Sequence, residues 1–555
     1  MNRTIVICLL GVLILNAAED KAFEFHGSAS IEPEYTYRNP NGAQIEHEPF
    51  GWNFRFRPKM KFWGMPLNLN FLLSSYEVDF RQPFNRFKFS LPSLSMPDLK
   101  FNAPWLELQL VDANPTYSAF SIEGMNVRGG AVDLKPGKFR LSVTGGQVQR
   151  GIVSSDTTDV AYLRWLYAGR LGWGKEEESH LHFHYLKAWD DSTSISDNTE
   201  IVTDSLYTDT VQVDYPEENA VATLEGKVAL LDGKLSFDGE LAGSAFSRNT
   251  ESSEIDNEYV NWIPEFIFTP RWSSQVGWAG RLGTELSIDN TEVELELEQV
   301  NWGFESAGIT SLDQDTRTVR ASFSQFFIKP FPISCMGSAD IARNNLDGMD
   351  FETTRYNMGF VYLGLFPQKA PDLSLTYVPY FSKTDDEGIL VSDYRMHSII
   401  ANSSYNFEMG ERPQRLSLNL TLSSDKDEIN ADTGSFSVDV GAIVNHELLD
   451  NLTLFWNAGE KSTIDSDDEI SHKYLGGLGY TLLLWDRRWR TTARVDFQTA
   501  VNRPEDRLFA NLSSSIEVFE GFDVKLTTRF TTYHSKDDED DYTEFLGRAE
   551  LSYNW

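Results

Sequence analysis

The chain has 555 residues, of which 13% are aromatic, and a formal net charge of −35. Phosphates would repel such an acidic chain, so nucleic acid is excluded as a partner. Mean hydropathy is −0.36, and beyond the N-terminus no apolar run approaches the roughly 18 residues that a transmembrane helix needs. The composition therefore excludes a protein that crosses a membrane with helices.

The first residues have the layout of a secretory signal peptide. Arg3 supplies a positive charge, residues 5–15 are apolar, and small residues follow them. The apolar run is too short to span a bilayer. We predict that residues 1–18 are a signal peptide. Residues 19–555 are predicted to form one domain, because no linker or change of composition divides them.

From about residue 372 to the end, segments alternate apolar and polar residues with a period of two. Leu416, Leu418 and Leu420, for example, alternate with Ser417 and Asn419. This period predicts β-strands with one apolar and one polar face. Tilted strands of about 9–11 such residues cross a bilayer, with the apolar face toward lipid and the polar face toward an enclosed lumen.

The connections between these segments are alternately short and long. Residues 485–487 and 520–521 are short, whereas residues 465–469 and 537–541 are longer and acidic. The same rhythm extends back to the start of the chain. It predicts an all-β fold, an antiparallel up-and-down transmembrane β-barrel of about 26 strands (roughly 22 to 28) with short periplasmic turns and longer acidic external loops.

The signal peptide and the barrel pattern together predict a location in the outer membrane. An even number of strands would place both termini in the periplasm. The alternative is a soluble periplasmic β-sandwich or β-solenoid, which would have to cover about two dozen apolar strand faces with other sheets. The last strand ends on Leu551, Tyr553 and Trp555 on one face. These residues resemble the C-terminal signal that barrel-assembly machinery reads, although the usual glycine position is not clearly matched.

Three strands carry charges on their polar face, so these charges would line the lumen and set its ion preference. In the alternative, they pair with opposite charges on neighbouring strands and stiffen the wall. The candidates are Arg55, Arg57, Lys59, Lys61, Glu292, Glu294, Glu296, Glu298, Arg488, Arg490 and Arg494.

The segment between residues 244 and 275 is long and rich in aromatic residues and proline. Its aromatic residues are Trp262, Phe266, Phe268 and Trp272. A barrel of about 26 strands encloses a wide lumen, so this segment is a candidate for a constriction that folds inward. An external hairpin extension is the alternative.

The sequence favours neither a metal site nor an enzyme. His180, His182 and His184 share a strand face, but histidines two apart are about 7 Å apart, so joint ligation of a metal needs a further strand. Solvated lumen histidines are the favoured interpretation. The acidic loops lack the spacing of a calcium site. His534 beside the acids of residues 537–541 has no nucleophile pattern, so we expect no catalytic residue, cofactor or metal.

Several stretches resemble large outer-membrane barrels of Bacteroidota and of the Chlorobi–Gemmatimonadota groups, and parts of them are similar to the very large barrel of the type 9 secretion translocon. The resemblance covers roughly the first two-thirds of the chain and implies the fold and the location, without transferable catalytic residues. It is carried by residues 67–75 (LNLNFLLSS), 84–87 (FNRF), 143–150 (VTGGQVQR), 230–235 (LLDGKL) and 240–245 (ELAGSA).

The function that we expect is a porin-like channel or transporter for polar solutes. The alternative is a barrel without a transport role, which anchors loops for adhesion or belongs to a secretion or envelope-assembly complex. The expected partners are outer-membrane lipid and, during biogenesis, the barrel-assembly machinery. No residue pattern identifies a subunit interface.

Overall fold

The computed structural model describes fourteen segments of the chain. They are residues 23–40, 49–75, 86–96, 101–152, 161–195, 199–203, 208–212, 215–257, 263–348, 351–429, 434–465, 470–501, 505–534 and 541–555. The expected signal peptide, residues 1–18, lies outside them. No helix in these segments is long and apolar enough to cross a membrane.

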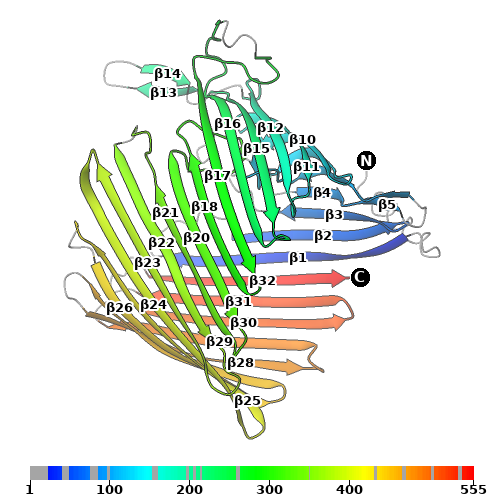
Figure 1. Cartoon of the computed structure of the whole chain (residues 1–555). Helices are drawn as coiled ribbons and strands as arrows, with labels where there is room; N and C mark the ends of the chain where they lie inside the picture. Colours follow the sequence, from blue (N-terminus) through cyan, green and yellow to red (C-terminus); the bar gives the residue numbers. More distant parts are fainter. Residues whose placement is uncertain are drawn as a thin grey trace.

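One antiparallel sheet of 26 strands closes on itself, because the first strand pairs with both the second and the last strand. Figure 1 shows the ring of tilted strands. Its first half comprises β1 (Phe23–Pro40), β2 (Phe50–Phe62), β3 (Met65–Ser74), β4 (Arg86–Leu91), β7 (Leu106–Ala113), β9 (Val127–Leu134), β10 (Phe139–Gln149), β11 (Leu163–Gly174), β12 (His180–Asp191), β15 (Glu218–Leu230), β16 (Leu235–Ser247), β17 (Ser274–Ile288) and β18 (Thr291–Val300).

The second half of the ring has longer and more regular strands. It comprises β20 (Thr316–Phe327), β21 (Ile333–Arg343), β22 (Glu352–Leu365), β23 (Asp372–Asp386), β24 (Ile389–Met409), β25 (Arg412–Asp427), β26 (Gly434–Leu449), β27 (Leu452–Asp465), β28 (Ile470–Leu484), β29 (Trp489–Val501), β30 (Asp506–Phe519), β31 (Phe522–His534) and β32 (Tyr542–Asn554). The prediction of an up-and-down antiparallel barrel of about 26 strands is confirmed.

Short additional strands in the described residues form three separate two-stranded sheets. They are β5 (Leu94–Met96) with β6 (Phe101–Ala103), β13 (Thr199–Thr203) with β14 (Thr208–Gln212), and β8 (Ile122–Glu123) with β19 (Gly308–Ile309). Two of these sheets come from loops at the rims of the barrel. The third, β8 with β19, joins segments far apart in the sequence and positions the site described below.

The two rims of the barrel differ as the alternating connections predicted. At one rim the connections are short, apart from that between β4 and β7, which contains β5 and β6. Residues with positive φ make the tight turns possible: Leu231, Asp232 and Gly233 have φ values of 53°, 57° and 83° between β15 and β16. Both ends of the described chain lie at this short-turn rim, since Phe23 pairs with Phe62 beside the β2–β3 turn and the Asn554 N–H donates to the Gly521 carbonyl of the β30–β31 turn.

The seam between β1 and β32 is closed by aromatic packing around the C-terminal residue. The Trp555 ring lies 5.4 Å from the Phe25 ring and 5.8 Å from the Phe56 ring. Gly27 exchanges two backbone hydrogen bonds with Trp555, and a Cβ on Gly27 would come 2.8 Å from the Trp555 ring. The C-terminal aromatic residue is therefore part of the barrel closure.

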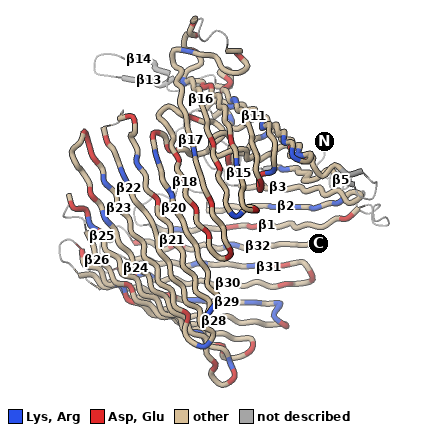
Figure 2. The backbone as a smooth tube through the Cα atoms, viewed as in Figure 1, with Lys and Arg blue, Asp and Glu red and all other residues tan. Residues whose placement is uncertain are grey.

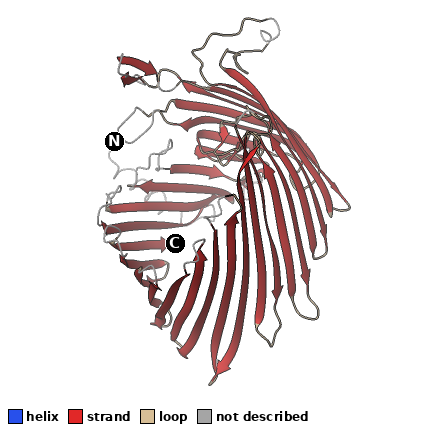
Figure 3. Cartoon of the chain, turned by 90° about the vertical axis from the view of Figure 1, so that its left-hand side faces the viewer, coloured by secondary structure: helices blue, strands red, loops and turns tan. Residues whose placement is uncertain are grey.

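The alternation of side chains separates an outer from an inner face. Large apolar residues on the outer face remain exposed, such as Leu224, Leu241 and Leu282 on β15–β17 and Leu418 on β25. The cross-strand register places polar residues on the inner face. Figure 3 shows short strands and loops inside the ring, and the buried hydrophobic cluster lies there, between these segments and the wall.

Candidate functional site

Two segments at the long-loop rim turn into the lumen. We call residues 114–126, between β7 and β9, and residues 301–315, between β18 and β20, the inner segments. β8 of the first pairs in parallel with β19 of the second, and Gly124 bridges Ile309. The Ser306 hydroxyl also donates to the Ser121 carbonyl at 2.7 Å. The two segments therefore form one unit, although they are far apart in the sequence.

The inner segments dock on the wall through apolar side chains. Phe120, Ile122 and Phe304 are fully buried, and the Phe120 and Phe304 rings meet edge to face at 5.9 Å. On the wall they meet small or apolar residues whose side chains the register places on the inner face. These wall residues are Leu166, Ala168, Leu186, Ala188, Val221, Ala242, Ala279 and Val300.

Buried hydrogen bonds fix the register of this docking. The Phe120 N–H donates to Glu240 Oε1 at 3.0 Å, and the Glu305 N–H donates to Ser244 Oγ at 3.0 Å. The Asn219 side chain donates to the Glu305 carbonyl at 2.9 Å and accepts from the Ala307 N–H at 2.8 Å. A loop that satisfies its backbone in this way is held in one position, because each broken bond would leave a buried polar group unpaired.

A glycine on the wall allows the closest approach. A Cβ on Gly277 of β17 would lie 2.1 Å from the Phe304 nitrogen and 2.4 Å from the Gly303 carbonyl carbon. Only glycine lets the backbone of the second inner segment lie directly on the inner face at this point.

A cavity of about 900 Å³ opens between the inner segments and the wall at the long-loop rim. Arg164 of β11 lines it together with Glu217, and Arg164 forms ion pairs with Asp190 at 2.7 Å and with Glu217 at 2.5 Å. Burial raises the pKa of the Glu217 carboxyl above its usual value, against the opposing effect of Arg164. The inner segments line the cavity with both apolar side chains, such as Met125 and Phe304, and polar ones, such as Ser306 and Gln314.

The inner segments divide the inner face into two regions. We call β10, β11, β12, β15, β16 and β17 the covered wall; its inward side chains are mostly buried, as at Thr144, Ala168 and Thr223. We call β21–β32 with β1 and β2 the open wall. There charged inward side chains are exposed, as at Lys59 and Arg490.

The candidate constriction loop lies on the outside of the wall. The register places Tyr185 and Lys187 of β12 on the outer face, where the Tyr185 hydroxyl donates to the Ile267 carbonyl at 3.0 Å and the Lys187 ammonium donates to the Glu265 carbonyl at 2.7 Å. Tyr167 binds the Phe266 carbonyl in the same way. The described part of this loop is therefore an external extension, and the inner segments occupy the lumen instead.

The four aromatic residues of this loop have different environments. Phe268 is buried, whereas Phe266 and Trp272 are 69% and 78% exposed. Trp262 lies outside the described residues. A segment rich in aromatic residues and proline thus covers the outer face of β11 and β12 and leaves two large rings in contact with the surroundings.

The cations of β2 face the lumen, as their alternation predicts, and β1 supplies acids opposite them. Arg55 pairs with Glu32 at 2.5 Å, and Lys61 pairs with Glu24 at 2.7 Å. Arg57 and Lys59 are exposed, and neither has an ion pair within the part of the chain that the structure describes. Both interpretations of these cations therefore apply. The ion pairs of Arg55 and Lys61 stiffen the wall, whereas Arg57 and Lys59 line the lumen and face solvent.

The acids of β18 also face the lumen, nearly opposite β2 in the ring; Figure 2 colours both strands by charge. Glu296 pairs with Arg320 of β20 at 2.5 Å and lies 3.7 Å from Arg281 of β17. Glu298 lies 3.8 Å from Arg320. Glu292 and Glu294 are exposed.

The three arginines near β29 are split between a turn and a strand. Arg488 lies in the short turn before β29, whereas Arg490 and Arg494 face the lumen. Arg494 pairs with Asp496 at 2.6 Å, and Arg490 is exposed.

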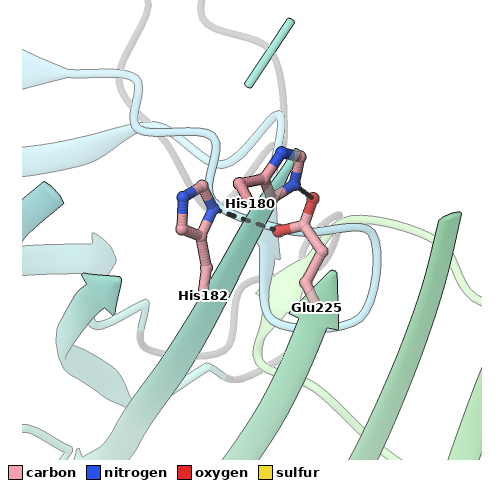
Figure 4. Close-up of side chains that lie close together, drawn as sticks. All are labelled: His180, His182 and Glu225. Atoms are coloured by element: carbon pink, nitrogen blue, oxygen red, sulfur yellow. Dashed lines mark ion pairs between the residues drawn. The ribbon is translucent and has the colours of Figure 1, made fainter. Parts of the chain in front are cut away.

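The structure places the three histidines of β12 together on the inner face, below the first inner segment. His182 and His184 are 1% and 0% exposed, so they are not the solvated lumen histidines that the sequence favoured. Glu225 of β15 lies directly across from His182 in the register and turns its carboxylate toward the imidazoles (Figure 4). Sequence spacing could not supply this residue, because it comes from the neighbouring strand.

No protein-family model matches the chain, and no curated protein is similar to it. Among solved structures, the P pilus usher (PapC) translocation pore is similar at 11% identity and a TM-score of 0.37, over 96% of this chain and 99% of that chain. The copper transporter OprC is 8% identical with a TM-score of 0.41, over 97% and 81%. A BenF-like porin from Pseudomonas fluorescens Pf-5 is 12% identical with a TM-score of 0.31, over 67% and 96%. This degree of likeness assigns neither a family nor an activity to the chain.

Proposed function

We propose that the chain is an outer-membrane channel that passes polar solutes through a lumen narrowed on one side by the inner segments. The observation that carries the proposal is the separation of the two faces. Apolar side chains such as Leu224 and Leu418 are exposed on the outside, and charged side chains such as Lys59 and Arg490 are exposed on the inside. A soluble body would bury the apolar outer face, whereas a barrel in lipid needs it exposed.

The inner segments support a restricted channel rather than an open one. A barrel of 26 strands encloses a wide lumen, and the hydrophobic cluster with its buried hydrogen bonds holds the inner segments against the covered wall. Solutes would pass along the open wall, between the cations of β2 and the acids of β18. We expect this cross-lumen field to orient ions and zwitterions in transit.

The placement in the membrane follows from the same proposal. The short-turn rim, with both ends of the described chain, would face the periplasm, and the long acidic loops would face outward. Lipid and the barrel-assembly machinery are the proposed partners, and Leu551, Tyr553 and Trp555 the proposed assembly signal. The kinship with Bacteroidota barrels stays a prediction, and we propose no catalysis.

Planar bilayers test the channel directly. The purified barrel, folded in detergent and added to one side of a bilayer, should give stepwise increases in current, carried by the dissolved salt ions. Reversal potentials in a salt gradient would give the charge preference. A barrel that shows the usual shift of gel mobility on heating, but never conducts, would refute the channel and support the alternative role as an adhesion scaffold or a component of an assembly complex.

A further inference from the structure

Four of the six ring nitrogens of the β12 histidines are buried without a hydrogen bond to any described residue. Neither ring nitrogen of His182 has a hydrogen bond within the described part of the chain, although the side chain is 1% exposed. His180 Nε2 and His184 Nδ1 are likewise buried without a hydrogen-bond partner there. Each buried group without a partner lowers the stability of the fold. Four such nitrogens in one place therefore point to a ligand that pairs with them.

The atoms converge on one point. His180 Nε2 lies 3.5 Å from Glu225 Oε1, and His182 Nδ1 lies 3.9 Å from Glu225 Oε2. The ligand atoms of these three residues all lie within 4.8 Å of one another. Ligand atoms about 2.0–2.2 Å from a tetrahedral zinc ion are separated by roughly 3.3 Å. Small side-chain adjustments would therefore bring the three groups to coordination distance (Figure 4).

Neighbouring groups set the protonation and orientation of the ligand atoms. His180 Nδ1 lies 3.2 Å from the carbonyl oxygens of Lys175 and Glu178, so this nitrogen carries the proton and Nε2 keeps its lone pair toward Glu225. His184 Nε2 lies 3.0 Å from Glu225 Oε2 and can hold that carboxylate in place. A backbone carbonyl and a second imidazole that orient the ligands are typical surroundings of a metal site.

The charge balance also favours a cation. Glu225 faces Glu240 across the β15–β16 pair, and Glu240 Oε2 is a further buried atom without a hydrogen bond in the described residues. Arg281 lies 3.9 Å from this oxygen, at the edge of an ion pair. A divalent ion among neutral imidazoles would compensate the charge of Glu225, and Arg281 would then be the nearer cation to Glu240.

From this geometry we propose that His180, His182 and Glu225 bind one divalent transition-metal ion of the zinc class, with His184 as the residue that positions the carboxylate. Imidazole nitrogens with one carboxylate suit zinc and copper, whereas calcium and magnesium prefer oxygen ligands alone. Three protein ligands would leave the fourth position of a tetrahedral ion free for water or another ligand. The site is independent of whether the barrel conducts.

Zinc titration of the detergent-folded barrel, stripped of metal beforehand, tests the site. We expect one saturable Zn²⁺ per chain that excess Ca²⁺ does not displace. His182→Ala and Glu225→Gln should each weaken Zn²⁺ binding by about 10- to 100-fold or more. His26→Ala is the matched control, because His26 also faces the lumen near the short-turn rim, opposite Lys59 of β2, and it should leave the affinity unchanged.

X-ray absorption of the unmutated zinc-loaded barrel gives a second test, which does not depend on the folding of a variant. Two imidazole ligands with oxygen in the remaining positions are expected. Absence of saturable Zn²⁺ binding, or zinc bound without histidine, would overturn the site. The same holds if His182→Ala, folded by its gel mobility, kept the full affinity. In that case ordered water alone would satisfy the buried nitrogens.

Discussion

The covered wall and the open wall are built from the same antiparallel ladder but obey different rules of packing. On the open wall an inward side chain meets water, so strands alternate cleanly and charges such as Arg490 and Lys525 remain exposed. On the covered wall an inward side chain meets the inner segments, and most positions hold small, apolar or buried polar residues, such as Ala168, Leu186 and Thr223. The inner face of a barrel therefore packs like the core of a soluble protein wherever a segment of the chain folds back onto it.

The largest contrast should appear when an inward arginine is removed from each wall. Arg170 of the covered wall is buried, pairs with Glu176 at 2.6 Å and donates to Ser142 Oγ at 3.1 Å. Its ring neighbour Tyr117 belongs to the first inner segment. A second acid, Asp133, lies 3.5 Å from Arg170 and is largely buried. Arg170→Ala should lower the free energy of unfolding by about 2–3 kcal/mol, because it leaves the Asp133 carboxylate without its cation.

Arg490→Ala on the open wall is the matched control, since that side chain is exposed and should contribute within about 0.5 kcal/mol. Urea titration of the folded barrels, followed by tryptophan fluorescence, measures both values. Equal losses in the two variants would mean that the covered wall is no more core-like than the open one.

The next largest effect is on single-channel conductance. It compares a glycine on the inner face of β17 with one on the outer face of the neighbouring strand β16. Gly277→Leu would drive a side chain into the backbone at Gly303 and Phe304 and lift the second inner segment from the wall. If this segment restricts the lumen, single-channel conductance should rise by roughly twofold or more. Gly243→Leu, on the outer face of the adjacent strand β16 with open space around it, should leave conductance unchanged. A smaller or unchanged conductance in Gly277→Leu would place the restriction elsewhere.

Ion preference should respond to the exposed lumen charges of β2 and β18. The double change Arg57→Glu and Lys59→Glu reverses two exposed lumen charges and should raise the permeability of cations over anions by roughly two- to threefold. Glu292→Lys, on the opposite side of the lumen, should shift the reversal potential the other way. If neither change moves the reversal potential, ions do not pass near these rows.

The same comparison explains what the sequence could and could not predict. Where water fills the lumen, as along β25, every second residue is polar, so the period of Leu416, Leu418 and Leu420 reports the strand and its faces directly. On the covered wall that signal weakens, because Ala168 and Val221 point inward as well and both faces are apolar. The strand count, which used the whole chain, was therefore clearest from about residue 372 to the end.

The inner segments themselves carried no clear signal. Phe120, Ile122 and Phe304 are scattered apolar residues in their loops, whereas the loop with Phe266 and Trp272 is richer in aromatic residues and lies outside. Aromatic content alone does not tell which face of the wall a loop covers. The informative residues were Gly277 and the inward alanines, which make room for a backbone, and that pattern has meaning only once the register is known.

The smallest expected effect is a pH dependence at the foot of the covered wall. Burial alone would raise the pKa of the Glu176 carboxyl in the β11–β12 turn, but the ion pair with Arg170 prevails and holds the pKa below its usual value. Because the pKa of Glu176 is lower in the folded barrel than in the unfolded chain, its ion pair stabilises the fold at any pH where the carboxylate is ionised in both states. This contribution disappears as the pH falls through the lowered value. Glu176→Gln should therefore melt slightly below the unmutated barrel at pH 6.

That difference in melting temperature should shrink as the pH falls below about 4. Glu177→Gln removes the same charge from the same turn without an ion pair to Arg170, so it controls for net charge. A constant difference at all pH values would show that the amide perturbs packing rather than the ion pair. A larger effect in Glu177→Gln would mean that overall charge, and not the contact with the buried arginine, sets the stability of this rim.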